Sequence, residues 1–160
     1  MTSAAQSRVG IVLVGGAFFA LFVHWRPARI VLFSEGWPAG PLVVAIVAAI
    51  CAVAGILFSV WAIRTLGKQW SFSARVIEGH RLVTHGPYAI VRNPIYASMT
   101  LWIVALALTF ATPVRLAIAL ALYVAGTLMR IGAEEELMHA TFGAQWDEYR
   151  RRVPALIPWL

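Results

Sequence analysis

The sequence predicts an all-α integral membrane protein with about four transmembrane helices and a C-terminal helix at the cytoplasmic interface. Apolar residues make up 61% of the 160 residues and charged residues only 12%, whereas soluble domains have about 45–50% and about 25%. The mean hydropathy of +0.78 excludes a disordered chain as well. Four apolar segments approach the roughly 20 residues that a helix needs to cross a bilayer. The length suits a single domain, residues 1–160.

Polar or proline-containing segments separate the four predicted spans. The spans cover Val9–Val23, Leu42–Ile63, Ile95–Thr112 and Val114–Ile131. No small-residue cleavage pattern follows the first span, so we interpret it as a retained helix rather than a signal peptide. The fourth span carries Arg115 and Arg130 only near its ends, where their side chains can reach the interface. No charge falls in the middle of a span, which argues against a small transporter.

Small residues lie four positions apart in the second predicted span, at Ala45/Ala49 and Gly55/Ser59. Such steps let two helices approach closely. We expect them to serve packing within one monomer rather than a dimer face, and the sequence leaves the oligomeric state open.

Basic residues are distributed along the chain in a way that predicts its orientation. Ten of the thirteen Lys and Arg residues lie before the first span, between the second and third spans, or from Arg130 onward. Because cytoplasmic loops are enriched in Lys and Arg, we expect both termini, and any site built near them, to face the cytosol. The net charge of +6 does not indicate nucleic-acid binding, because only Arg150–Arg152 form a dense basic run. These three arginines are expected to attract anionic membrane lipids.

Several common chemistries have no motif in this chain. GxGxxG, GxxxxGKS/T, HExxH and GxSxG are all absent, so nucleotide-binding α/β folds, zinc proteases and serine hydrolases are not predicted. The single cysteine, Cys51, excludes an internal disulfide and a multi-cysteine metal site. Glu135 and His139 lie four residues apart, which is more typical of a surface contact. We therefore predict no metal site.

The segment before the third span combines turn signals with a helix start. Residues 73–77 and 81–84 flank a glycine, which predicts a tight hairpin or an irregular turn. Asn93 followed by Pro94 is typical of a helix start, with Asn93 at the N-cap and Pro94 at the first helical position. A helix start beside Arg92 is also a place where an anionic group can bind.

A cluster of charges follows the fourth span, in the stretch Arg130-Ile131-Gly132-Ala133-Glu134-Glu135-Glu136. One interpretation is a solvated helix face with an Arg130–Glu134 pair at i, i+4. The other is a group of carboxylates that holds a cationic ligand near low-dielectric surroundings. Further on, four apolar residues recur at helical spacing and predict a helix: Phe142, Trp146, Tyr149 and Val153. Gly143 is expected to divide this helix into two pieces.

Two blocks of residues resemble a known family. The first contains Leu66-Gly67, Trp70-Ser71, Glu78-Gly79-His80, Leu82-Val83, Gly86-Pro87-Tyr88 and Arg92-Asn93-Pro94-x-Tyr96. The second contains Arg130-Ile131-x-x-Glu134-Glu135-x-Leu137, Phe142-Gly143-x-x-Trp146-x-x-Tyr149, Val153-Pro154 and Ile157-Pro158. Together they resemble the isoprenylcysteine carboxyl methyltransferases and the related phospholipid N-methyltransferases, which are integral membrane enzymes that use S-adenosylmethionine. The resemblance covers about the last 95 residues, so residues 66–160 are expected to form the cofactor-binding core and residues 1–65 two N-terminal spans.

The resemblance implies a pocket for S-adenosylmethionine with two walls. One wall would contain Tyr88, Arg92, Asn93, Pro94 and Tyr96, and the other Glu134 and Glu135. The carboxylates would hold the ammonium group and the ribose hydroxyls, while Arg92 or the helix start would bind the carboxylate of the cofactor. Adenine would stack on Tyr88 or pack against apolar side chains.

Three positions depart from the family pattern. Asn93 stands where the family commonly has histidine, Ser98 where it often has glycine, and Trp146 where tyrosine is frequent. Asparagine does not titrate near neutral pH, so a general base at position 93 is not expected.

The lack of an evident base bears on the methyl acceptor. A carboxylate is already a nucleophile, whereas an ammonium headgroup must first lose a proton. We therefore expect a lipophilic or lipidated carboxylate acceptor from the bilayer, steered by Arg150 or Arg151. A phospholipid amine is the alternative acceptor, and a non-catalytic membrane subunit is the alternative from another class.

Overall fold

The computed structural model describes residues 3–22, 40–67, 81–110 and 113–158, and every regular element in these ranges is helical. The all-α prediction is therefore confirmed. The helices are α1 (Ser3–Phe22), α2 (Gly40–Leu66), the short 3₁₀ helix η2 (Gly86–Ala89), α3 (Pro94–Phe110), α4 (Pro113–Phe142) and α5 (Ala144–Arg152). By length and composition α1, α2 and α4 can each cross a membrane, and α3 is a shorter apolar helix. Each of these four helices overlaps one of the four predicted spans.

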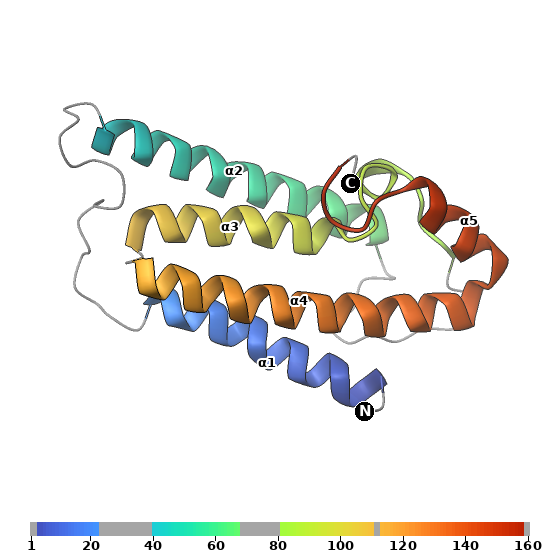
Figure 1. Ribbon diagram of the computed structural model, residues 1–160. Coiled ribbons are helices and arrows are strands. Elements are labelled where there is room, and N and C mark those ends of the chain that lie inside the picture. Colours follow the sequence, from blue (N-terminus) through green and yellow to red (C-terminus); the bar gives the residue numbers. More distant parts are fainter. Residues whose placement is uncertain (1–2, 23–39, 68–80, 111–112, 159–160) are drawn as a thin grey trace.

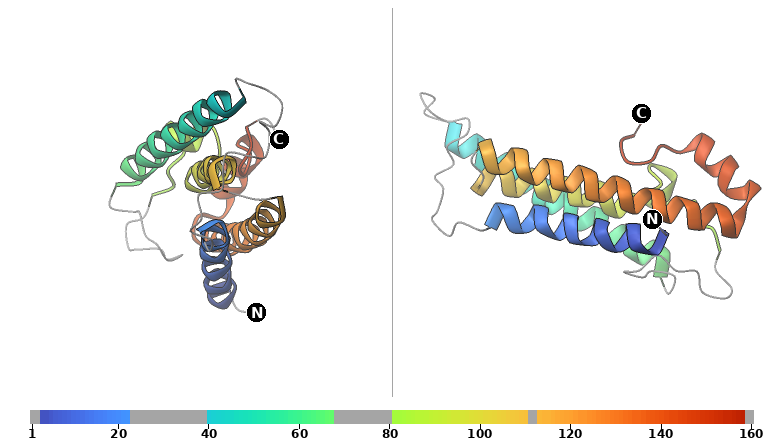
Figure 2. Two further views of the ribbon diagram at one scale, coloured as in Figure 1. Left: turned by 90° about the vertical axis from the view of Figure 1, so that its left-hand side faces the viewer. Right: turned by 60° about the horizontal axis from the view of Figure 1, so that its bottom comes forward.

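The four long helices lie side by side and alternate in direction (Figure 1). As a result the start of α1, the end of α2, the start of α3 and the last turns of α4 all lie at one end of the molecule. We call this the polar end. Helix α2 packs along α3 and α1 packs along α4, so that α3 separates α2 from the other pair (Figure 2). Beyond the polar end of α4, α5 turns back toward the start of α3.

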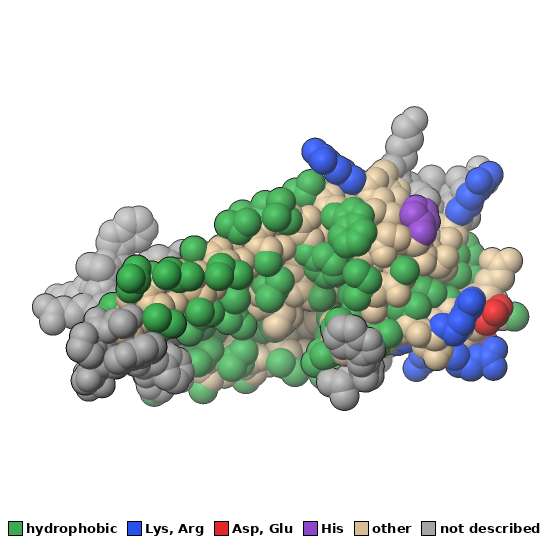
Figure 3. Space-filling model, turned by 90° about the horizontal axis from the view of Figure 1, so that it is seen from above, with side chains coloured by type: hydrophobic (Ala, Val, Ile, Leu, Met, Phe, Trp, Pro, Cys, Tyr) green, Lys and Arg blue, Asp and Glu red, His purple; other side chains and the backbone are tan. Residues whose placement is uncertain are grey.

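The outer surface of the long helices is apolar. Large side chains such as Val12, Leu42 and Leu57 are more than half exposed, which suits contact with hydrocarbon rather than water. On the face shown in Figure 3, hydrophobic side chains cover most of the length and charged side chains gather toward the polar end. A smaller core joins α1, α3 and α4 through buried residues that include Leu21, Ile103 and Tyr123.

The small-residue steps of α2 differ in what they contact. Gly55 and Ser59 are buried, and the Ser59 hydroxyl lies 2.5 Å from that of Ser98 on α3. A Cβ atom on Gly55 would lie 2.3 Å from the indole of Trp102, also on α3. The predicted monomer packing is thus confirmed for this step, whereas Ala45 and Ala49 are exposed.

Helix α4 is longer than the predicted fourth span. The span was expected to end at Ile131, but the helix continues through the three glutamates to Phe142, because the intervening Glu, Leu, Met and Ala residues are strong helix formers. Gly143 then adopts φ +50 and separates α4 from α5, a conformation that favours glycine. The predicted break at Gly143 is confirmed.

The predicted hairpin around Gly79 lies mostly outside the described residues. Its second flank, residues 81–84, has no regular structure. This segment leads into η2 and then to the start of α3, at the polar end.

Candidate functional site

The start of α3 follows the prediction. The helix begins at Pro94, and the Asn93 carbonyl accepts the first hydrogen bond of the helix from the Ala97 N–H at 3.0 Å. The side chain of Asn93 is used differently, since its amide donates to the Ala155 carbonyl at 3.2 Å. Asn93 thus joins the start of α3 to the segment that follows α5.

Arg92 connects three separate parts of the polar end. Its Nε and Nη2 atoms donate to Oε1 of Glu135 at 3.1 and 2.8 Å. Its Nη1 atom donates to the carbonyls of Arg150, at 2.9 Å, and Val153. The Arg92 side chain is 9% exposed, so these bonds form largely away from water. Every nitrogen of the Arg92 guanidinium therefore has a partner within the chain.

The segment after α5 also covers the backbone in front of α3. The N–H groups of Arg92 and Asn93 donate to the carbonyls of Pro154 and Ala155 at 2.8 and 3.0 Å. Sequence reasoning missed this pairing, because a backbone contact between residues about 60 positions apart leaves no side-chain pattern. These two N–H groups are already satisfied and do not form an open anion site.

A second network lies around Glu134. Its Oε1 atom accepts hydrogen bonds from the Tyr96 hydroxyl and from Nη2 of Arg130, both at 2.7 Å. Arg130 Nε also donates to the Tyr96 hydroxyl, and the guanidinium lies over the Tyr96 ring at 5.7 Å. The predicted Arg130–Glu134 pair is confirmed, but the Arg130 side chain is only 10% exposed, so the pair does not lie on a solvated face. Both hydrogen bonds to Glu134 end on one oxygen, Oε1.

Two buried tyrosines lie beside these networks. The Tyr149 hydroxyl donates to the Tyr88 carbonyl at 2.7 Å, which fixes α5 against η2. Burial raises the pKa of the Tyr88 hydroxyl above its usual value, and the nearby Tyr149 and Glu134 raise it further. Burial also raises the pKa of Tyr149, an effect that the positive charge of Arg92 partly offsets. Both hydroxyls therefore remain protonated hydrogen-bond donors at neutral pH.

The two arginines expected to steer the acceptor lie in different surroundings. Nε of Arg150 lies 3.6 Å from Oε2 of Glu135, and the Arg150 side chain is 56% exposed. Arg151 is exposed on the same helix. Among the described residues, Arg92, Arg130 and Arg150 thus lie within 4 Å of the carboxylates of Glu134 and Glu135. The positive charge here exceeds the negative charge by one.

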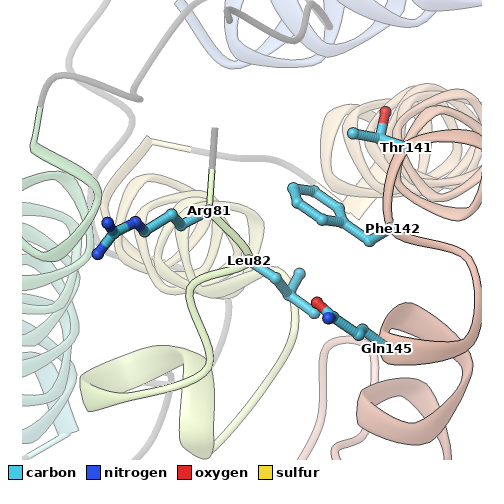
Figure 4. A pocket seen from close by; sticks show the side chains of 5 residues that line it. All are labelled: Arg81, Leu82, Thr141, Phe142 and Gln145. Atoms are coloured by element: carbon cyan, nitrogen blue, oxygen red, sulfur yellow. The ribbon is translucent and has the colours of Figure 1, made fainter. Parts of the chain in front are cut away.

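A pocket of about 510 Å³ opens at the turn between α4 and α5 (Figure 4). Thr141 and Phe142 come from the last turn of α4, about two helical turns beyond Glu134. Leu82 and Gln145 approach one another across the pocket, and the Phe142 ring points toward the segment that contains Leu82. Sequence reasoning singled out Phe142 only as part of an apolar stripe. The full lining is Arg81, Leu82, Thr141, Phe142 and Gln145.

The two motif blocks, which are separated along the chain, thus meet at the polar end. Tyr88, Arg92 and Tyr96 come from the first block and contact α4 or α5 of the second. The family model described as phospholipid methyltransferase matches residues 43–145. The chain belongs to the phospholipid methyltransferase family.

Two plant relatives carry a more specific name. The chain is 35% identical over 102 residues to protein-S-isoprenylcysteine O-methyltransferase B of Arabidopsis thaliana, covering 62% of this chain and 51% of the relative. It is 32% identical over 114 residues to protein-S-isoprenylcysteine O-methyltransferase A of the same plant, covering 69% and 57%. The chain therefore spans about half the length of these curated relatives.

A third relative has a different kind of name. The nickel-cobalt-cadmium resistance protein NccN of Alcaligenes xylosoxydans xylosoxydans is 36% identical over 104 residues, covering 60% of this chain and 45% of the relative. Sequences similar to this chain thus belong to proteins named for different roles.

The match to the phospholipid methyltransferase family begins earlier than the motifs do. It includes nearly all of α2 and ends at Gln145, whereas the motifs start at Leu66. The family match therefore extends into the predicted second span, which the two motif blocks did not reach. Helix α1 lies outside the match. The family and the apolar helices together identify an integral membrane protein.

Proposed function

We propose that this protein transfers a methyl group from S-adenosylmethionine to a lipophilic carboxylate acceptor. The observation that carries the proposal is the meeting of Arg92, Tyr96, Glu134 and Glu135 in adjoining hydrogen-bonded networks at the polar end of an apolar helix bundle. The family and the names of the two plant relatives support the same reaction. At this end we assign the meeting point of a soluble methyl donor and an acceptor from the bilayer.

The residues present suit the charges of S-adenosylmethionine, which bears a sulfonium, an ammonium and a carboxylate. We assign the ammonium to Glu134, whose Oε2 atom is free of the hydrogen bonds that hold Oε1. Tyr88 supplies a protonated hydroxyl nearby. The pocket at the α4–α5 turn lies about two helical turns beyond Glu134, and none of the residues assigned to the cofactor lines it.

Arg92 requires a different assignment from the one that the resemblance implied. Its guanidinium already binds Glu135 and two carbonyls, so we assign it to holding the second motif block against the first. Arg150 is half exposed beside Glu135 and is the better candidate to bind an anionic group. Arg151 is exposed and is assigned to lipid headgroups.

The excess positive charge favours a carboxylate over an ammonium headgroup as the acceptor. Three guanidinium groups lie within 4 Å of two carboxylates, and the exposed one, Arg150, attracts an anionic acceptor, while Glu134 is assigned to the ammonium of the methyl donor. When bound, the sulfonium supplies its methyl carbon to a nucleophile by in-line displacement, and a carboxylate oxygen can act without losing a proton. The chain contributes by orienting the two reactants and excluding water. Asn93 offers no base, because an amide does not titrate near neutral pH, and its side chain already donates to the Ala155 carbonyl.

We assign the polar end to the cytoplasmic side of the membrane. The start of α1 and the segment after α5 both lie there (Figure 1), and this end carries most of the basic residues. A soluble methyl donor reaches a site on that side directly, while the apolar surface of α2 and α3 remains in contact with lipid.

The product of the reaction tests the proposal. Purified protein in lipid nanodiscs would be incubated with methyl-labelled S-adenosylmethionine, first with N-acetyl-S-farnesylcysteine and then with phosphatidylethanolamine. We expect base-labile label in the farnesylcysteine product, as a methyl ester requires. Base-stable label in phosphatidylethanolamine would favour the phospholipid amine instead. Absence of label in both acceptors and in a total lipid extract would favour a non-catalytic subunit.

A further inference from the structure

Ser7 on α1 contacts the network that contains Glu134. Its hydroxyl accepts a hydrogen bond from Nη1 of Arg130 at 3.3 Å. Ser7 is 6% exposed and Arg130 is 8% exposed, so the contact is buried between α1 and α4. Helix α1 lies outside the family match at residues 43–145, and no motif pointed to Ser7.

Two glycines bring α1 and α4 close enough for this contact. A Cβ atom on Gly10 would lie 2.6 Å from Cγ of Arg130 and 2.8 Å from the Gly126 carbonyl oxygen. A Cβ atom on Gly126 would lie 2.8 Å from the Gly10 carbonyl oxygen and 2.9 Å from the Val14 nitrogen. Real Cβ atoms do not approach other atoms this closely, so the crossing requires glycine at both positions. Ser7 lies one helical turn from this crossing.

The guanidinium of Arg130 is thereby held from more than one side. Nη1 donates to Ser7, Nη2 donates to Glu134, and Nε donates to the Tyr96 hydroxyl. A buried guanidinium is stable only when its donors are paired. Because the guanidinium is planar and rigid, fixing Nη1 also fixes the direction of the other donors.

We propose that α1 is part of the site and that Ser7 is a positioning residue, which orients Arg130 and through it Glu134 and Tyr96. The inference rests on the proposed function, in which Glu134 binds the methyl donor. It extends the site to a helix that carries no family signal. The Gly10–Gly126 crossing keeps Ser7 against Arg130.

The test compares Ser7→Ala, Ser7→Thr and a control on the same helix, Gly15→Ala, whose added methyl would meet nothing within 4 Å. Affinity for S-adenosylmethionine would be measured by titration in detergent, beside the thermal midpoint without ligand. We expect Ser7→Ala to weaken binding about tenfold, as the loss of a hydrogen bond to a charged group implies. Ser7→Thr keeps the hydroxyl and should restore binding, and Gly15→Ala should bind like the wild type.

A second readout does not depend on the cofactor. With ¹⁵N-arginine, the Nε–H resonance of Arg130 can be assigned from its loss in Arg130→Lys. Ser7→Ala should shift this resonance, whereas Ser7→Thr and Gly15→Ala should leave it nearly in place. If the wild type binds no S-adenosylmethionine, the proposed function fails and this resonance alone decides the role of Ser7. The inference is overturned if Ser7→Ala leaves the resonance unmoved, or if its affinity equals that of the wild type.

Discussion

Nη2 of Arg92 and Oε1 of Glu135 lie 2.8 Å apart, although 43 residues separate them in the chain. Arg92 precedes α3 and Glu135 belongs to α4. Both side chains are largely buried, at 9% and 14% exposed. The pair therefore joins the two motif blocks directly, and Arg150 approaches the other oxygen of Glu135 from α5.

Replacing Arg92 should destabilise the protein more than it alters the chemistry. Arg92→Ala leaves the Glu135 carboxylate and two backbone carbonyls without their donors, and breaking a buried pair costs about 3–5 kcal/mol. Arg92→Lys should lose part of this stabilisation, because lysine cannot reproduce the planar fork of donors that arginine presents. The thermal midpoint without ligand measures the effect, with Arg151→Ala as the exposed control. A midpoint for Arg92→Ala equal to that of Arg151→Ala would contradict this assignment.

Replacing Glu134 should weaken cofactor binding more than it destabilises the protein. Glu134→Gln keeps the shape of the side chain but removes the charge assigned to the ammonium, so we expect affinity for S-adenosylmethionine to fall at least about tenfold. Glu136→Gln alters an exposed neighbour and should bind normally. Titration of the three proteins gives the comparison. If the double variant Glu134→Ala with Glu135→Ala still binds with wild-type affinity, these residues do not bind the methyl donor.

The close crossing of α1 and α4 predicts that alanine at Gly126 and alanine at Gly15 affect stability differently. In Gly126→Ala the new methyl group would meet the backbone of α1 at Gly10 and Val14, which cannot move aside cheaply. We expect a loss of about 1–3 kcal/mol, as for other overpacked contacts. Gly15→Ala has open space and should melt like the wild type or slightly higher, since alanine favours helix. Equal midpoints for the two variants would argue against the close crossing.

The buried tyrosines predict alkaline sensitivity. Tyrosine in an unfolded chain titrates near pH 10, whereas burial raises the pKa of Tyr149 in the folded protein. Above about pH 10 the unfolded state therefore binds fewer protons than the folded state, and the free energy of unfolding falls as the pH rises. Below about pH 10 this group contributes no pH dependence.

Tyr149→Phe should make that decline shallower. It also removes the hydrogen bond to the Tyr88 carbonyl, which lowers stability at neutral pH by about 1 kcal/mol. Thermal melts at neutral pH and above about pH 10 separate the two effects. An alkaline slope as steep in Tyr149→Phe as in the wild type would show that Tyr149 is not the responsible group.

Local features of the fold could be predicted from the sequence because they depend on neighbouring residues. Pro94 starts α3, Gly143 ends α4, and Arg130 and Glu134 pair one turn apart. The span was predicted to end at Ile131 and the charge cluster after it was interpreted as a helix face, but their union in one continuous helix up to Phe142 was not predicted. The helix extends beyond the apolar residues because the residues that follow them have high helix propensity.

The long-range contacts of the site could not be predicted in this way. The pairing of Arg92 with Glu135, the backbone bonds to Pro154 and Ala155, and the contact of Ser7 with Arg130 depend on how the helices cross. The resemblance placed Arg92 in the pocket wall by its position in the first motif block, and its positive charge suited the carboxylate of the cofactor. In the folded chain the donors of Arg92 are already used, and only the three-dimensional arrangement reveals this.

The most direct measurement is a calorimetric titration of the full chain in nanodiscs with S-adenosylmethionine. Methyltransfer at the polar end requires one saturable site per chain, with a dissociation constant in the range of about 1 μM to about 1 mM that is usual for enzyme substrates. S-adenosylhomocysteine should compete for that site. A flat titration across this range, from protein that melts cooperatively, would contradict the assignment of Glu134 and its neighbours to a methyl donor.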